Sequence, residues 1–177
     1  MSDRSGQARA LTSFTPIVSG RAGELRAYLR GLPRGPASPL ARLLRTHFAR
    51  WVIIDRLPTD PPDPDRLEQP YLLFTSCIDG DAESYLRELA EHLPGEAEAI
   101  WSHCRGFPGA RDPGAFARWL LDHHVPTSFF VANYPKATVH DVRQSLAAHE
   151  QLLRFALDTQ GLDAPTRLER FRTAFRV

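Results

Sequence analysis

The chain has 177 residues, 42% hydrophobic and 24% charged, which is typical of a soluble globular protein of about one domain. Its net charge of +1 lacks the basic excess of a nucleic-acid-binding protein, so we expect no nucleic-acid partner. The first ten residues carry no apolar signal region, and no run approaches the roughly 18 apolar residues of a membrane span, so we expect a cytoplasmic protein without a membrane partner. Two cysteines, Cys77 and Cys104, are too few for a disulfide framework, and we expect free thiols.

Hydrophobic periodicity predicts alternating strands and helices in the first half of the chain. A period of two in β-branched and aromatic residues indicates a strand, and a period near 3.6 indicates an amphipathic helix. A loop rich in proline and aspartate, 58–70, separates the two central strands, and we expect it to be exposed. The predicted elements, in chain order, are a strand at 11–17, a helix at 19–32, a short helix at 35–46, strands at 47–55 and 70–78, and a helix at 79–93.

The second half is expected to be mainly helical. Glycine and proline divide an insert, 96–124, into two short helices. The run VPTSFFVANYP, residues 125–135, predicts a fourth strand. The longest helix is predicted over 138–157, with Thr138 as its N-cap and Asp141 completing a start that is similar to a capping box.

Without the inserts, the order of elements is βαββαβ, as in the ferredoxin-like fold. We therefore expect an α+β domain with an antiparallel sheet over 11–157, after a flexible N-terminus at 1–10 and before a helical tail at 158–177. Helices on one side of such a sheet leave its other side bare. The second predicted strand is apolar on both sides, with Trp51 on one and Val52 on the other. Because a second copy would cover the bare side, we expect a homodimer.

The runs THFARWVIID, YLLFTSCIDGDAESYL and AIWSHCRGFPG, in this order of elements, resemble the dimeric α/β-barrel superfamily. More narrowly, they look like uncharacterised bacterial proteins associated with heme peroxidases or catalases. The superfamily includes cofactor-free monooxygenases and cyclases, heme-degrading monooxygenases and larger heme proteins. The resemblance implies a dimeric barrel and a heme-dependent oxidoreductase, similar to a peroxidase or an oxygenase, that acts on a small hydrophobic or aromatic substrate in the barrel cavity.

Three residues are candidates for catalysis in such a cavity. Side chains alternate along a strand, so His47 and Arg50 point to opposite faces unless a bulge intervenes. A permanent charge on an apolar face needs an anion, which makes Arg50 a candidate for holding a substrate carboxylate or a heme propionate. His47 is a candidate acid, base or axial ligand, and Tyr134 is a candidate hydrogen-bond donor.

Three other residues are candidates for binding heme. Trp101 and His103 lie close together in the run AIWSHC, and heme iron accepts a histidine or a cysteine thiolate. His149 lies at the centre of an apolar stripe on the predicted helix 138–157. In heme-degrading members of the superfamily a helix that lines the pocket carries the axial histidine, so the resemblance makes His149 the candidate metal ligand. Each of these residues also has a structural interpretation, as a packed core residue or a residue at the end of an element.

Three classes of function stay open. The leading hypothesis is the heme-dependent oxidoreductase. The first alternative is a cofactor-free monooxygenase, cyclase or isomerase, and the second is a non-catalytic dimerisation or ligand-binding module. The chain carries no phosphate loop, H-E-x-x-H zinc motif or G-x-S-x-G nucleophile motif that would indicate another chemistry.

Overall fold

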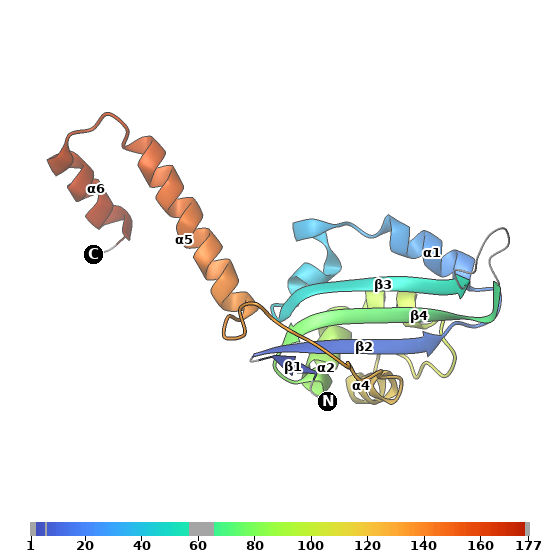
Figure 1. Cartoon of the computed structure of the whole chain (residues 1–177). Coiled ribbons are helices and arrows are strands. Elements are labelled where there is room, and N and C mark those ends of the chain that lie inside the picture. Colours follow the sequence, from blue (N-terminus) through green and yellow to red (C-terminus); the bar gives the residue numbers. More distant parts are fainter. Residues whose placement is uncertain (1–2, 6, 57–65, 176–177) are drawn as a thin grey trace, which may run out of the picture. The chain divides into compact units, whose positions relative to one another are not determined.

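The computed structural model describes residues 3–5, 7–56 and 66–175 (Figure 1). These residues form a mixed α+β structure with an open antiparallel sheet and six α-helices. The chain divides into two compact units, Met1–Val139 and His140–Val177. The first unit contains the whole sheet, and the second contains most of α5 together with α6.

The sheet has the strand order β1-β2-β4-β3, and all neighbours are antiparallel (Figure 1). The strands are β1 (Arg4–Ser5), β2 (Ala8–Pro16), β3 (Thr46–Arg56) and β4 (Arg66–Asp79). The first three strands expected from the sequence are confirmed as β2, β3 and β4. The end of the expected proline-rich loop belongs to β4, and the rest of that loop, 58–65, lies outside the described residues.

Four helices of the first unit pack with the sheet around one hydrophobic core. They are α1 (Ala22–Gly31), α2 (Ala82–His92), α3 (Pro94–Trp101) and α4 (Pro113–Asp122). Helix α2 contacts α4, α1 contacts α3 and β3, and α4 contacts β2. The helices expected in these places are confirmed.

The short helix expected at 35–46 forms as two 3₁₀ helices, Gly35–Ala37 and Pro39–Arg42. Ser38 separates them in an extended conformation, which the residue before a proline favours. The position of this helix was therefore predicted correctly, but its type was wrong.

Aromatic rings form the centre of the core. Trp101, at the end of α3, is fully buried and makes edge-to-face contacts with Phe74 and Phe116 at ring-centroid distances of 5.5 and 5.2 Å. Trp51 of β3 stacks on Phe74 at 5.4 Å. The core side of β3 is thus occupied, as its alternating sequence predicts.

The fourth strand expected at 125–135 is wrong. Its first residue approaches the sheet, since the Val125 N–H donates to the Thr12 carbonyl at 2.9 Å. Further along the segment no strand forms, and Phe129 and Tyr134 are exposed. The edge position beside the start of β2 belongs to β1 instead, so most of this apolar run has no strand to pair with.

Three separate segments close the outer edge of β2. Strand β1 pairs with its start. In the middle, the Phe14 N–H donates to the His123 carbonyl at 2.9 Å, and at the end the Arg105 N–H donates to the Pro16 carbonyl at 2.8 Å. An open strand edge is a template for pairing with other chains, and along β2 this edge is covered.

The second unit is a pair of helices. Helix α5 (Val139–Asp158) and helix α6 (Ala164–Phe175) confirm the two helices expected in this part of the chain. Their contact is aromatic: the ring centroid of Phe155 lies 5.6 Å from those of Phe171 and Phe175. Among the described residues, no helix combines the length and the apolar character needed to cross a bilayer.

Candidate functional site

The side of the sheet turned away from the core carries a row of apolar side chains, which we call the open face. It consists of the residues that alternate with the core residues of β2, β3 and β4: Thr12, Phe14, Phe48, Arg50, Val52, Ile54, Tyr71, Leu73, Thr75 and Cys77. Phe48 is 62% exposed and Val52 is 39% exposed, while Phe14 stacks on Tyr71 with ring centroids 4.4 Å apart. An exposed apolar surface of this kind indicates a binding face.

Arg50 lies on the open face between Phe48 and Val52. Its Nε donates to the Thr75 hydroxyl at 3.0 Å, across the β3–β4 pair. The side chain is exposed, and none of the ion pairs among the described residues includes Arg50. The open face therefore combines apolar area with a cation that, within the described part of the chain, has N–H groups beyond the one that binds Thr75 left for a ligand.

A β-bulge places His47 on the same face as Arg50. The pairing register of β3 shifts by one residue between Thr46 and Phe48, so His47 is the extra residue. Its Nε2 lies 2.8 Å from Oδ1 of Asp79, which alternation along β4 places on the open face. The sequence allowed His47 and Arg50 to share a face only if a bulge intervenes, and the structure contains that bulge.

Asp79 connects His47 to the start of α5. The residue is 8% exposed, and its second oxygen, Oδ2, accepts a hydrogen bond from the backbone N–H of Val139 at 2.7 Å. A carboxylate at a helix N-terminus satisfies an otherwise unpaired N–H and interacts favourably with the helix dipole. Sequence reasoning missed this role because it assigned Asp79 to the start of the helix predicted at 79–93.

Both cysteines are free and buried, as expected. Burial, and next the nearby charge of Asp79, raise the pKa of Cys77. Burial raises the pKa of Cys104 to about 11, against the opposing effect of the Thr15 hydroxyl, which donates to Sγ at 3.3 Å. Each sulfur is therefore a neutral thiol at neutral pH, unlike the thiolate that would ligate iron.

Trp101 and His103 lie in the core. The Trp101 indole is fully buried, and its Nε1 has no hydrogen-bond partner among the described residues. His103 is 8% exposed, with Nε2 3.7 Å from the Glu24 carboxylate and Nδ1 buried without a partner in the described part of the chain. These two residues pack behind the sheet and do not share the open face.

Tyr134 and His149 are both exposed. Tyr134 precedes α5 in an irregular segment, where its carbonyl accepts a hydrogen bond from the Ala137 N–H at 3.1 Å. His149 lies on α5, in the second unit. Of the six candidates, the structure therefore brings together His47 and Arg50, and it places Trp101 and His103 close together elsewhere.

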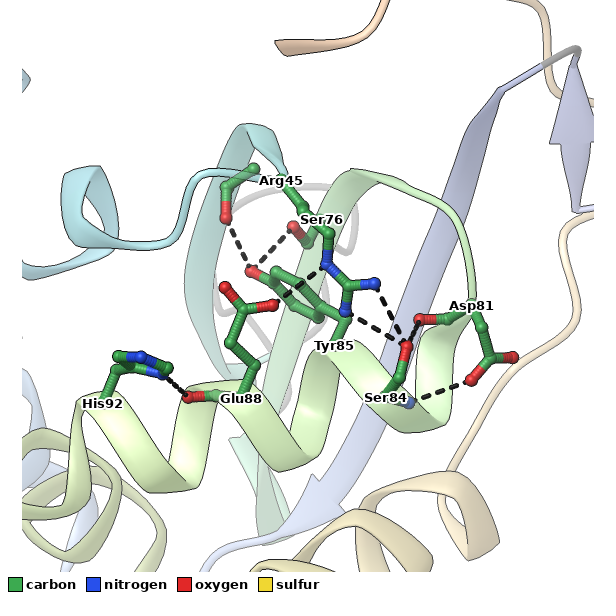
Figure 2. Close-up of polar contacts among 8 residues, drawn as sticks. Arg45, Ser76, Asp81, Ser84, Tyr85, Glu88 and His92 are labelled. Atoms are coloured by element: carbon green, nitrogen blue, oxygen red, sulfur yellow. Dashed lines mark hydrogen bonds and ion pairs between the residues drawn. The ribbon is translucent and has the colours of Figure 1, made fainter. Parts of the chain in front are cut away.

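A polar cluster that sequence reasoning missed surrounds the buried Tyr85 (Figure 2). The Tyr85 hydroxyl lies 3.0 Å from the Thr46 hydroxyl and 3.4 Å from that of Ser76, and burial raises its pKa. Arg45 lies over the ring at 5.9 Å and donates to Glu88 at 2.9 Å. The cluster connects α2 to β3 and β4 with its hydroxyls satisfied, which is the pattern of a structural network.

Protein-family models, curated proteins and solved structures were compared with this chain, and none of them matches it. The fold and the site therefore define a structural class of protein. It is a mixed α+β protein whose open sheet face presents an arginine and an oriented histidine.

Proposed function

We propose that the chain is a binding protein for a small apolar molecule that carries a carboxylate. The observation that supports this is Arg50, a cation without an ion-pair partner in the described residues, set among exposed apolar side chains. Apolar ligand surface gains about 25 cal/mol for each Å² that the open face removes from water. A guanidinium also matches the two oxygens of a carboxylate, so one site recognises both parts of the ligand.

The proposal includes a homodimer, as the resemblance to dimeric α/β barrels implies. Two open faces placed against each other would bury Phe48 and Val52, which are exposed in a single copy, and the stacked pair of Phe14 and Tyr71, which is partly exposed. The ligand would lie between the two faces, with an Arg50 from each side.

The catalytic form of this proposal is a cofactor-free monooxygenase, cyclase or isomerase. His47 is the residue that supports it, because the Asp79 carboxylate orients the imidazole on the face where the ligand would bind. Imidazole is the side chain that general acid–base catalysis uses most often. The His47–Asp79 pair therefore supplies a general base if the ligand is a substrate.

Heme belongs to the proposed ligand class, since it is flat, apolar and carries two propionates. Neither His47 nor His103 fits it as an axial ligand, however: Asp79 binds Nε2 of His47, and His103 is enclosed in the core. His149 belongs to the second unit, and Arg50 belongs to the first. A heme-dependent oxidoreductase with His149 as metal ligand stays a prediction, which the experiment below tests.

Fluorescence titration with 11-(dansylamino)undecanoic acid and with its methyl ester tests the proposal. In R50L we expect acid binding to weaken about 10- to 100-fold, because a charge-assisted hydrogen bond contributes about 1.5–3 kcal/mol. Binding of the ester should stay unchanged. R50K, which keeps the charge but loses the planar fork, should lie between the two. R30L, at an exposed position in the last turn of α1, is the matched control.

Equal affinity of the wild-type protein for acid and ester would contradict the proposal, as would an R50L variant that binds the acid normally. Titration with hemin separates the heme hypothesis. A saturable Soret band that disappears in one of H149A, H103A or H47A would establish heme ligation. Hemin that produces no saturable band would leave the cofactor-free forms of the proposal.

A further inference from the structure

Helix α5 has two apolar sides, of which α6 covers one. Phe155 contacts the aromatic residues of α6, and the Gln151 side-chain amide donates to the Ala174 carbonyl at 2.9 Å. Leu146 and Leu153 lie about 140–180° around the helix from these contacts, at 3.6 residues per turn. They are 63% and 51% exposed. The helix thus presents a second apolar stripe on the side opposite α6.

The spacing of this stripe is that of a coiled coil. Its positions alternate steps of four and three residues: Val142, Leu146, His149, Leu153 and Ala156. This spacing is the a/d pattern of a heptad repeat, which forms a narrow seam between two helices, whereas a helix that packs on a sheet presents a broader face. The stripe therefore fits another helix better than it fits a sheet.

The charges beside the stripe indicate which helix and in which direction. In an antiparallel pair that sets Leu146 against His149 of the other helix, Val142 faces Leu153, so these four seam positions meet one another. Ala156 then faces Val139, the first residue of α5. Arg143 of each helix then lies beside Glu150 of the other helix, on the same flank of the seam. The two-fold axis makes two such opposite-charge pairs. A parallel pair would instead set these charges beside the uncharged Thr138 and Ser145.

We propose that α5 binds α5 of a second copy as an antiparallel two-stranded coiled coil, centred on the Leu146 and His149 layers. This association goes beyond ligand binding at the open face and uses residues of a different unit.

Cysteine cross-linking tests the pairing and its direction. Positions 142 and 153 are about 16 Å apart along one helix, too far for a disulfide within a chain. The variant V142C/L153C should therefore form a covalent dimer on oxidation, and so should an equimolar mixture of V142C and L153C. Each single variant alone should stay monomeric on a denaturing gel. The native cysteines are buried, which keeps the wild-type background low.

Cross-linking of V142C alone would indicate a parallel pair and would overturn the proposal, and so would absence of a cross-link in V142C/L153C. The variant V52D places a charge on the open face and should disrupt the proposed pairing of two sheets. It should leave the α5 cross-link in place, which separates the two associations. Loss of the cross-link in V52D would show that α5 does not pair independently, and would also overturn the proposal.

Charge exchange gives a second test by light scattering over a range of concentrations. All proteins compared, including the wild-type reference, carry V52D, so that the proposed pairing of open faces does not contribute. R143E and E150R should each raise the dimer dissociation constant about tenfold, because two pairs become like-charged. The double variant R143E/E150R should return to within about threefold of the wild type. Q144E makes a similar change outside the seam and should have no effect. A double variant no better than the singles, or an L146D variant that dimerises through α5 normally, would overturn the proposal.

Discussion

His47 and Arg50 show how one residue changes the chemistry of a strand. Regular alternation would send them to opposite sides of the sheet, and one extra residue at His47 brings both to the open face. The bulge also brings the imidazole to Asp79, which then shares its two oxygens between His47 and Val139. An oriented imidazole and an anion-binding guanidinium thus lie only three residues apart on one strand.

Sequence reasoning correctly placed Arg50 on an apolar face, because alternation around Phe48 and Val52 is a local pattern. The bulge was not predictable in the same way. It brings His47 to Asp79, 32 residues later, and no local pattern around His47 reports that partner.

Cys104 supports a prediction about alkaline pH. Its pKa rises to about 11 in the folded protein, from an ordinary value of 9.0, so the stabilisation is present below pH 9.0 and is lost as the pH rises through 11. We expect the contribution of Cys104 to the free energy of unfolding to fall by about 2 kcal/mol between pH 9 and pH 11. Urea denaturation of the wild type and C104A at several pH values measures this. If the two proteins lose stability with the same slope, the thiol does not contribute.

At the scale of elements, α2 shows how one capping residue defines a helix start. Asp81 precedes the helix, and its side chain accepts a hydrogen bond from the Ser84 N–H at 2.9 Å. That bond, the largest influence, lowers the pKa of Asp81. The helix was predicted at 79–93, and an aspartate before an amphipathic segment is a local signal of a helix start.

Removal of this cap should destabilise the fold. We expect D81A to lower the free energy of unfolding by about 1 kcal/mol, because it leaves the Ser84 N–H without its side-chain acceptor. D81S keeps an acceptor and should recover most of the loss. Urea denaturation at neutral pH provides the comparison. The urea midpoint of D81A should be lower than that of D81S. Equal midpoints would show that the cap contributes nothing.

The element that the sequence did not predict correctly is the strand at 125–135. Its residues have strand propensity, but strand formation needs a partner edge, and the place of that edge is decided by tertiary structure. β1, only two residues long, takes the start of β2. A short pairing of this kind lies below what hydrophobic periodicity can detect.

At the scale of the molecule, the two units should unfold separately. All three tryptophans, Trp51, Trp101 and Trp119, lie in the first unit, so their fluorescence reports only that unit. Far-ultraviolet circular dichroism reports all helices, including α5 and α6. Because these two helices have few buried side chains, we expect the dichroism to change at lower urea concentration than the fluorescence.

The variant F155A provides the control for this prediction. It removes the ring that α6 packs against, so it should move the early dichroism change and leave the tryptophan transition in place. Coincident transitions in the wild type would show that the chain unfolds as one cooperative unit instead.

The covered edge of β2 has a consequence for synthesis of the chain. Thr15 contacts Cys104, 89 residues later, and the Thr12 carbonyl contacts His124, 112 residues later. A ribosome adds about 5–20 residues per second, so roughly 5–20 s separate the appearance of β2 from that of the segments that cover it. During that interval the nascent chain carries an open strand edge, the kind of surface that chaperones shield and that neighbouring polysomal chains can pair with. The topology that protects the finished sheet thus makes translation the period of greatest exposure to aggregation.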